Sequence, residues 1–197
     1  MRKLMTIALL ATAMLLGSAA AQAQAVKHTT RGGLLIQTDL EFGGDSVATV
    51  AFEDGSEQDV DAGQGISLAI GGFFRPSATT PFEISGSVGY KFVTTAASNA
   101  NINLSRTVLK LNATWWFENG WFVTGGLTHH LSPELNGDDF FEDVHFDDAT
   151  GFSAEVGWRW IALRYTNIEY SHPLFEDVDA SSIGLGFTWR FGSHRGY

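Results

Sequence analysis

Thr166 is a candidate hydroxyl nucleophile, a role that requires a base beside it. It lies in the segment Arg164-Tyr165-Thr166-Asn167, which the acidic residues Asp177 and Asp179 follow. A hydroxyl becomes a nucleophile only when an adjacent base takes its proton. Arg164 is effectively always protonated, and His172 lies six residues beyond Thr166. No nucleophile–base pair is apparent, so we predict no catalytic residues and no cofactor.

Four histidines near carboxylates are the second candidate, as ligands for a divalent cation. His129 and His130 end a predicted strand, while His145 and His172 lie in acidic segments. Adjacent strand residues point to opposite faces, so His129 and His130 cannot both contact one ion. The spacing matches no compact metal-binding motif, and we predict no specific metal site. Loose attraction of divalent cations to the acidic segments is expected instead.

Composition excludes several classes of protein. The chain of 197 residues has no cysteine, which excludes thiolate nucleophiles and disulfides. Its net charge of −10 argues against nucleic-acid binding, which needs a basic face. Charged residues make up only 17%, against about 25% in an ordinary soluble domain. Hydrophobic residues reach 44% and aromatic residues 13%, which argues against disorder.

Residues 1–25 are predicted to be a secretory signal peptide. Arg2 and Lys3 precede an apolar run over Leu4–Leu16, and small-residue cleavage sites end at Ala23 and Ala25. The run is shorter than the ~20 residues of a membrane-spanning helix. Residues 26–197 are then one domain. Since no later segment is a candidate membrane helix, a membrane location would require a closed barrel.

Alternation of apolar and polar residues predicts eight antiparallel strands, and an all-β, up-and-down transmembrane β-barrel. In the last strand, Ile183, Leu185, Phe187, Trp189 and Phe191 share one face. The other strands are predicted near residues 34–42, 66–70, 82–91, 106–115, 121–131, 152–159 and 162–170. In the strand at 162–170 the phase of the alternation slips near Thr166–Asn167, which predicts a bulge there.

Short and long connections alternate between these strands. The short ones are Arg75–Pro81, Asn119-Gly120 and Arg159–Ala162; the long ones are Gly43–Gly65, Thr94–Ser105, Ser132–Thr150 and Ser171–Ser181. The first long connection contains Asp54-Gly55, which favours a small hairpin. Three of the long connections hold 16 of the 22 acidic residues and no Lys or Arg. An even strand number with short turns at one end is typical of outer-membrane barrels.

Aromatic residues mark the opposite end. The six tryptophans, which lie beside the short connections, are Trp115, Trp116, Trp121, Trp158, Trp160 and Trp189. Trp prefers the boundary between membrane and water, and membrane barrels gather it in girdles. A soluble eight-stranded carrier is the alternative. A soluble carrier would have no physical reason to gather tryptophan at one end and acidic residues at the other, so we favour the membrane barrel.

Charged residues are predicted on the strand faces opposite the aliphatic ones. They are Asp39, Glu41, Glu83, Lys91, Arg106, Lys110, Glu155, Arg159, Arg164 and Arg190. An eight-stranded barrel is just wide enough to be filled by side chains, and buried charges must be paired. We therefore predict an ion-pair network that plugs the lumen. A charged pathway for a small solute is the alternative.

With these features the chain resembles the small eight-stranded outer-membrane proteins of the OmpA-like and OmpW-like barrel group. The segment Gly186-Phe187-Thr188-Trp189-Arg190-Phe191 is similar to their signal for the barrel-insertion machinery, in which Gly186, Trp189 and Phe191 are the defining positions. Here a tail, Gly192–Tyr197, follows the signal. The resemblance implies the outer membrane of a Gram-negative bacterium, with acidic loops outside and termini in the periplasm. It also implies contact with membrane lipid and with lipopolysaccharide, which divalent cations bridge.

The segment around Thr166 also faintly resembles the His-x-Ser-Asn…acid region of lipid A deacylases. Arg164 stands in place of the base, and Thr166 in place of the nucleophilic serine. We therefore expect a non-enzymatic surface protein that contributes to envelope integrity or surface interaction. The alternatives are a narrow channel or binder for a small, hydrophobic solute, and a lipid A-modifying enzyme.

Overall fold

The computed structural model describes residues 32–51, 57–76, 80–94, 102–138, 141–173 and 175–192. The predicted signal peptide, the Asp54-Gly55 turn and the tail beyond Gly192 lie outside the described residues. Among the described residues, no helix is long and apolar enough to cross a membrane.

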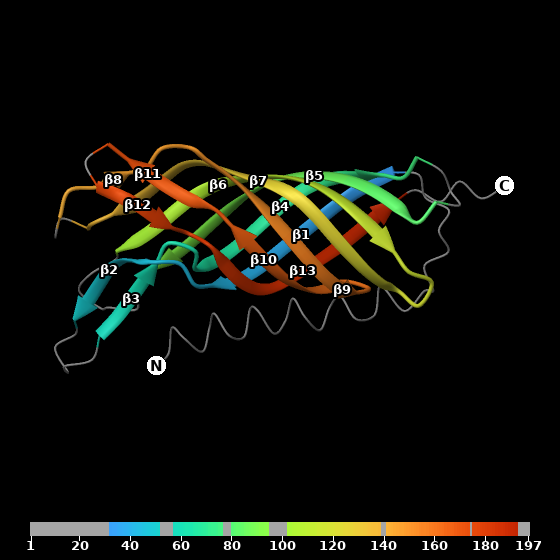
Figure 1. The fold of residues 1–197 in the computed structure, drawn as a ribbon, viewed down its shortest axis with the longest axis horizontal. Coiled ribbons are helices and arrows are strands. Elements are labelled where there is room, and N and C mark those ends of the chain that lie inside the picture. The colour runs from blue at the N-terminus through green and yellow to red at the C-terminus, as the bar shows by residue number, and fades with distance from the viewer. Residues whose placement is uncertain are drawn as a thin grey trace.

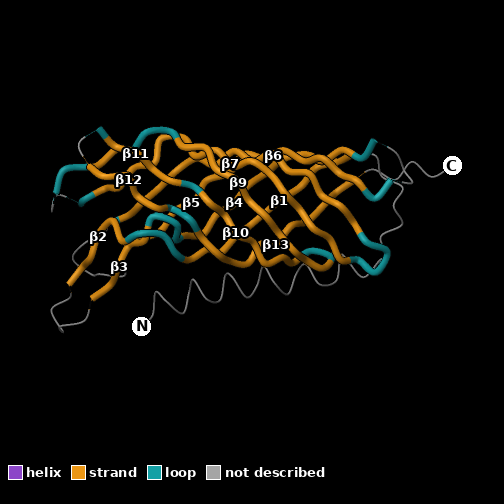
Figure 2. The backbone as a smooth tube through the Cα atoms, viewed as in Figure 1, coloured by secondary structure: helices purple, strands orange, loops and turns teal. Residues whose placement is uncertain are grey.

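Eight antiparallel strands close into a barrel, which confirms the predicted fold class (Figures 1 and 2). Around the wall they follow the order β6-β5-β4-β1-β13-β10-β9-β7, and pairing of β6 with β7 closes the ring. The bounds are β1 Gly32–Phe42, β4 Gly65–Phe74, β5 Phe82–Thr94, β6 Asn103–Trp116, β7 Trp121–Asn136, β9 Ala149–Trp158, β10 Ile161–Asn167 and β13 Ser182–Gly192.

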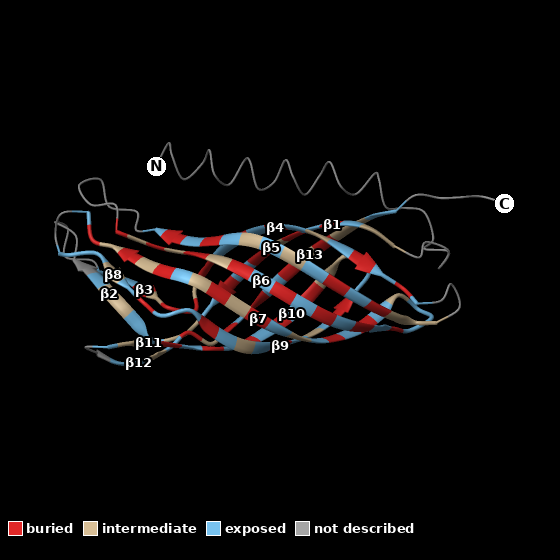
Figure 3. Cartoon of the chain, turned by 90° about the horizontal axis from the view of Figure 1, so that it is seen from above, coloured by how far each residue is buried: buried red, intermediate tan, exposed pale blue. Residues whose placement is uncertain are grey.

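The outward face of the wall is apolar and the inward face is polar, as a membrane requires. Buried and exposed residues alternate along the strands (Figure 3), and the exposed face is aliphatic. Leu34, Leu68 and Leu111 are 61%, 62% and 58% exposed. The inward face carries polar residues such as Gln37, Thr124 and Ser153. A soluble barrel would place these residues the other way round, so the wall is built to face lipid.

The remaining strands gather at one end of the barrel, called here the long-loop end (Figure 1). Strand β2 (Ser46–Ala51) pairs with β3 (Glu57–Asp61), on either side of the predicted Asp54-Gly55 turn. Strand β11 (Glu169–His172) pairs with β12 (Phe175–Asp179), and β8 (Val144–His145) pairs with the end of β7. The opposite, short-turn end carries tight turns in which Gly120 and Arg159 have positive φ angles of 83° and 57°.

The predicted bulge near Thr166–Asn167 is wrong. The inward–outward alternation continues unbroken through Ile168 and Tyr170, which are buried, although the regular strand β10 ends at Asn167. The apparent slip arises because the interior changes from polar to apolar at this level. A register shift does occur further on, between Tyr170 and His172.

The barrel interior as the candidate functional site

Asp39 lies at the centre of the charged interior and is 2% exposed. Its Oδ2 atom lies 2.6 Å from Nζ of Lys110 and accepts a 2.7 Å hydrogen bond from the Ser67 hydroxyl. Its Oδ1 atom pairs with Nη1 of Arg164. Arg164 also donates from Nε and Nη2 to Oε1 of Glu155, at 3.0 and 2.7 Å. Charge-assisted contacts of this kind are the stronger class of hydrogen bond, and here they join five strands, β1, β4, β6, β9 and β10, across the lumen.

Glu41 forms a second centre on the same face of β1. It lies 2.8 Å from Nζ of Lys91 and accepts hydrogen bonds of 3.1 Å from the hydroxyls of Thr166 and Ser182. Lys91 in turn donates a 2.6 Å hydrogen bond to the carbonyl of Gly63, in the turn between β3 and β4. A loop segment therefore enters the mouth of the barrel and contacts the charged layer.

Glu83 forms a third centre near the short-turn end, and it is fully buried. Its two carboxylate oxygens accept from Arg75 and Arg190, each at 2.9 Å. Both guanidinium groups lie over the ring of Trp116, at 5.7 and 4.8 Å from its centroid, which adds cation–π attraction. Trp116 packs on Phe122 at 4.7 Å, so charged and aromatic groups together fill this end.

Arg75 also belongs to this network, although the sequence predicted it to lie in the turn Arg75–Pro81. It continues the inward phase of Ser67, Ala69 and Phe73 on β4, and it is only 5% exposed. Extending the alternation five residues past the predicted strand end at Ile70 would have found it.

Arg106 differs from the other cations of the lumen, each of which is paired with a carboxylate. It is 1% exposed, and its Nη2 donates to the backbone carbonyls of Ala62 and Gln64 at 2.8 and 2.9 Å. Its Nε and Nη1 groups have no hydrogen-bond partner within the described part of the chain. The guanidinium is thus held by neutral acceptors rather than by a carboxylate.

Nine of the ten predicted lumen residues point inward, and Arg159 does not. Strand β9 ends at Trp158, so Arg159 falls in the tight turn, where its positive φ of 57° breaks the alternation. It is exposed, and its guanidinium lies 4.2 Å from the centroid of the Trp158 ring. Its assignment to the lumen was wrong.

The tryptophans divide between the two faces of the wall. Trp115, Trp121 and Trp158 are 48%, 48% and 39% exposed, and Trp189 is half-buried on the outer side. Trp160 lies in the turn after β9 and stacks on Phe187 at 5.7 Å. Trp116 does not belong to an outer girdle, because the residue after outward-facing Trp115 must point inward; it is 7% exposed.

An apolar core, which the sequence analysis did not anticipate, lies above the charged layer at the long-loop end. We call it the apolar cap; its buried members are Val60, Ala62, Val93, Ile102, Leu104, Leu135, Phe146, Ala149, Ile168, Tyr170 and Ala180. Tyr170 is fully buried, and its hydroxyl lies 2.6 Å from Nδ1 of His130. Burial raises the pKa of Tyr170, which keeps this hydroxyl neutral.

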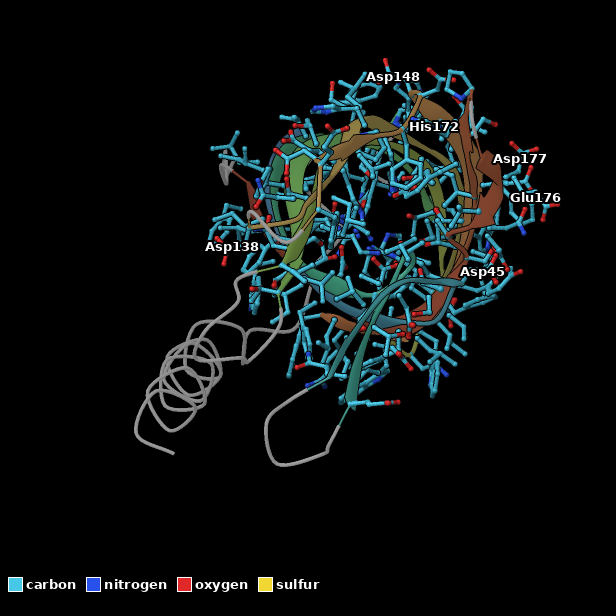
Figure 4. The ribbon with its side chains drawn as sticks, turned by 90° about the vertical axis from the view of Figure 1, so that its left-hand side faces the viewer. Asp45, Asp138, Asp148, His172, Glu176 and Asp177 are labelled. Atoms are coloured by element: carbon cyan, nitrogen blue, oxygen red, sulfur yellow. The ribbon has the colours of Figure 1, made fainter. Side chains whose placement is uncertain are left out.

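The described histidines and acids of the long-loop end do not gather at one point, although His145 lies 3.9 Å from Glu134. Figure 4 shows Asp45, Asp138, Asp148, His172, Glu176 and Asp177 distributed around the rim. His129 contacts Thr150, whereas His130 points inward to Tyr170. Within the described ranges, no group of three or more His, Cys, Asp or Glu is arranged to hold a metal ion.

Thr166 is not accessible from outside the barrel. Its hydroxyl donates to Glu41 at 3.1 Å, and its side chain is buried in the lumen. Arg164, in the position that a base would take, is held between Asp39 and Glu155.

A closed barrel with an aliphatic outer face and an ion-paired interior is the architecture of a transmembrane β-barrel protein. The family comparison agrees with this class and makes it specific. Residues 8–191 match the model of the outer membrane protein beta-barrel domain, and the chain belongs to this family. It is therefore an outer-membrane β-barrel protein.

Among solved structures, the chain is similar to Ail, the attachment invasion locus protein of Yersinia pestis. The identity is 8% and the TM-score 0.45, over 81% of this chain and 99% of that one. Ail in complex with the heparin analogue sucrose octasulfate gives 10% identity and a TM-score of 0.43, over 81% of this chain and 99% of that one. At these values the likeness carries no information on ligands. No curated protein matches the chain significantly in sequence.

Proposed function

We propose that this protein is a non-conducting, non-enzymatic outer-membrane barrel that acts at its long-loop end, in envelope integrity or in interactions at the cell surface. The observation that carries this proposal is the filled interior. Charged residues occupy the lumen at several levels, and the apolar cap covers them at the long-loop end. With the interior occupied, the exposed loops are the part of the protein left to meet a partner.

The charged layer opposes conduction because opening a path would separate buried ion pairs. Asp39, Lys110 and Arg164 are each at most 9% exposed. Breaking one buried pair costs about 3–5 kcal/mol, and a continuous path would require several to break together. The narrow interior of an eight-stranded barrel leaves little room for rearrangement.

A lack of enzymatic activity is supported by the state of Thr166 and Arg164. Both are engaged with carboxylates inside the lumen, and neither is exposed to lipid or to solvent. A reacting hydroxyl needs a base within hydrogen-bond reach and access to the substrate. The Glu41 carboxylate lies within hydrogen-bond reach of Thr166, but it is paired with Lys91, and the Thr166 hydroxyl is buried in the lumen, where a substrate has no access to it.

The long-loop end supplies a surface of one charge sign. Its exposed acids among the described residues are Asp45, Glu57, Asp59, Asp138, Glu142, Asp143, Asp147, Asp148, Glu169, Glu176, Asp177 and Asp179. Hydrogen bonds from Ser181 hold the pKa of Asp179 below its usual value, which favours its charged form. We propose that this end faces the cell exterior and attracts the divalent cations that bridge lipopolysaccharide. The termini then lie in the periplasm, where the Gly186, Trp189 and Phe191 signal of β13 meets the insertion machinery.

Planar-bilayer recording tests the closed lumen. Purified protein is expected to show no discrete openings under conditions in which a general porin conducts. Reproducible unitary openings would contradict the proposal and favour the solute channel.

Mass spectrometry of lipid A from cells with and without the gene tests the non-enzymatic role. Identical acylation in the two strains is expected. A gene-dependent loss or gain of an acyl chain would overturn this part of the proposal.

A further inference from the structure

The barrel interior contains more positive than negative side chains. Within the described ranges, the inward-facing cations are Arg75, Lys91, Arg106, Lys110, Arg164 and Arg190. The inward-facing carboxylates are those of Asp39, Glu41, Glu83 and Glu155. The lumen therefore has two more cations than carboxylates. A buried charge without an opposite charge is costly, so such an excess needs a compensating group.

The excess is greatest around Arg106. In the β5–β6 register Arg106 stands directly opposite Lys91, and both side chains point inward. Like charges placed directly opposite each other on a sheet repel. The nearby carboxylate, Glu41, is paired with Lys91. Arg106 forms no ion pair with any described residue, although it is 1% exposed.

The hydrogen bonds of Arg106 are also incomplete. Both contacts of Nη2 go to backbone carbonyls, those of Ala62 and Gln64, which supply dipoles but no negative charge. The Nε and Nη1 groups are left as buried donors. Leaving a buried charged donor unsatisfied costs more than leaving a neutral one. The apolar cap above this level contributes no acid to compensate it.

We propose that the lumen holds a small inorganic anion in contact with the free N–H groups of Arg106, beneath the turn formed by residues 62–64. Water would satisfy the donors but leave the charge excess in place. An anion would accept hydrogen bonds from the free donors and would also reduce the excess of positive charge. Guanidinium groups bind halides and oxyanions by charge-assisted hydrogen bonds. The anion is then a structural ligand that joins the β3–β4 turn to the barrel wall. This site is independent of the proposed surface function.

Thermal unfolding of the refolded full barrel in detergent tests the site. Sodium bromide or phosphate replaces sodium gluconate at constant ionic strength and pH. A ligand that binds only the folded state raises its stability in a saturable way. We expect at least one of the two anions to raise the melting temperature, by about 2–4 °C for each kcal/mol of binding free energy. Bromide and phosphate together distinguish a halide site from an oxyanion site.

Arg106→Gln is expected to abolish the response. Arg159→Gln removes the same charge from an exposed turn and is expected to keep it, which controls for screening. Equal melting temperatures of the wild type in all three salts would overturn the proposal. So would a response of Arg106→Gln that equals that of the wild type.

Wild-type crystals provide a second measurement that does not depend on the folding of a variant. After bromide soaking, or in phosphate, anion density is expected within hydrogen-bond distance of Arg106. Density only at surface sites would identify an adventitious ion only and would overturn the proposal.

Discussion

Asp39 of β1 and Arg164 of β10 form an ion pair although β13 lies between their strands. The pair is possible because β13 presents Gly186 to the lumen, opposite Asp39 in the register. A Cβ atom at Gly186 would lie 3.0 Å from Oδ1 of Asp39 and 3.5 Å from Nη2 of Arg164. Because Gly186 has no side chain, Asp39 of β1 and Arg164 of β10 can pair across β13.

Gly186→Leu is expected to destabilise the barrel by about 1–3 kcal/mol, because the new side chain overpacks the space that the ion pair occupies. Urea unfolding after refolding into detergent measures this cost without the insertion machinery. Gly125→Leu is the matched control, since Gly125 faces outward and a Cβ there meets no atom within 4 Å. Equal stability of the two variants would contradict the packing role of Gly186.

Asp39→Asn removes the carboxylate that pairs with Lys110 and Arg164. We expect a loss of about 3–5 kcal/mol in the free energy of unfolding, because two buried cations lose a partner. Asp177→Asn, at the exposed rim, is expected to stay within about 0.5 kcal/mol of the wild type. A small effect of Asp39→Asn would show that water readily replaces the ion pairs.

Leu104→Ala tests the apolar cap. Leu104 is fully buried in it, so we expect a loss of about 2–5 kcal/mol from transfer and cavity effects. Leu111→Ala changes the same residue type on the same strand, but Leu111 faces outward and is 58% exposed. Its cost in detergent is expected to be smaller. If the two costs are equal, the cap contributes no more to stability than the outer surface.

Tyr170→Phe is expected to change both the neutral stability and its dependence on alkaline pH. At neutral pH the lost hydrogen bond to His130 costs about 1 kcal/mol. Burial raises the pKa of Tyr170 in the folded state. Its contribution is therefore fully present below the unfolded pKa, near 10, and is lost as the pH rises through the folded pKa.

The free energy of unfolding of the wild type should thus fall more steeply above about pH 10 than that of Tyr170→Phe. Urea unfolding at pH 8 to 11 measures the difference between the two slopes. Parallel curves would show that Tyr170 titrates at the same pH in the folded and unfolded states.

The barrel was predictable from the sequence because alternation is a local signal. It assigned Asp39, Lys110 and Arg164 to the inward face, but their pairing depends on cross-lumen distances that alternation does not encode. Arg75 and Trp116 were misplaced because strands β4 and β6 carry their inward phase to the edge of the turns.

The apolar cap was not predictable in the same way. Some of its members, such as Val60 and Phe146, come from separate loop segments that share no sequence period, while Leu104 and Leu135 extend the inward face of β6 and β7. These groups meet because the barrel brings the long connections and the ends of these strands together at one end. Ile168 points inward after the polar inward residues Arg164 and Thr166. The sequence pattern therefore suggested a change of phase that the structure does not have.

The orientation of the barrel in the membrane is tested by cysteine labelling, for which the chain is suited because it contains no cysteine. Asp177→Cys places a thiol at the rim of the long-loop end, and Asn119→Cys places one at the short-turn end. Both native residues are exposed, so neither substitution disturbs the interior. A membrane-impermeant maleimide applied to intact cells is expected to label Asp177→Cys and to spare Asn119→Cys. Both should react once the outer membrane is permeabilised. The reverse pattern on intact cells would place the acidic loops in the periplasm and would remove their proposed contact with lipopolysaccharide at the cell surface.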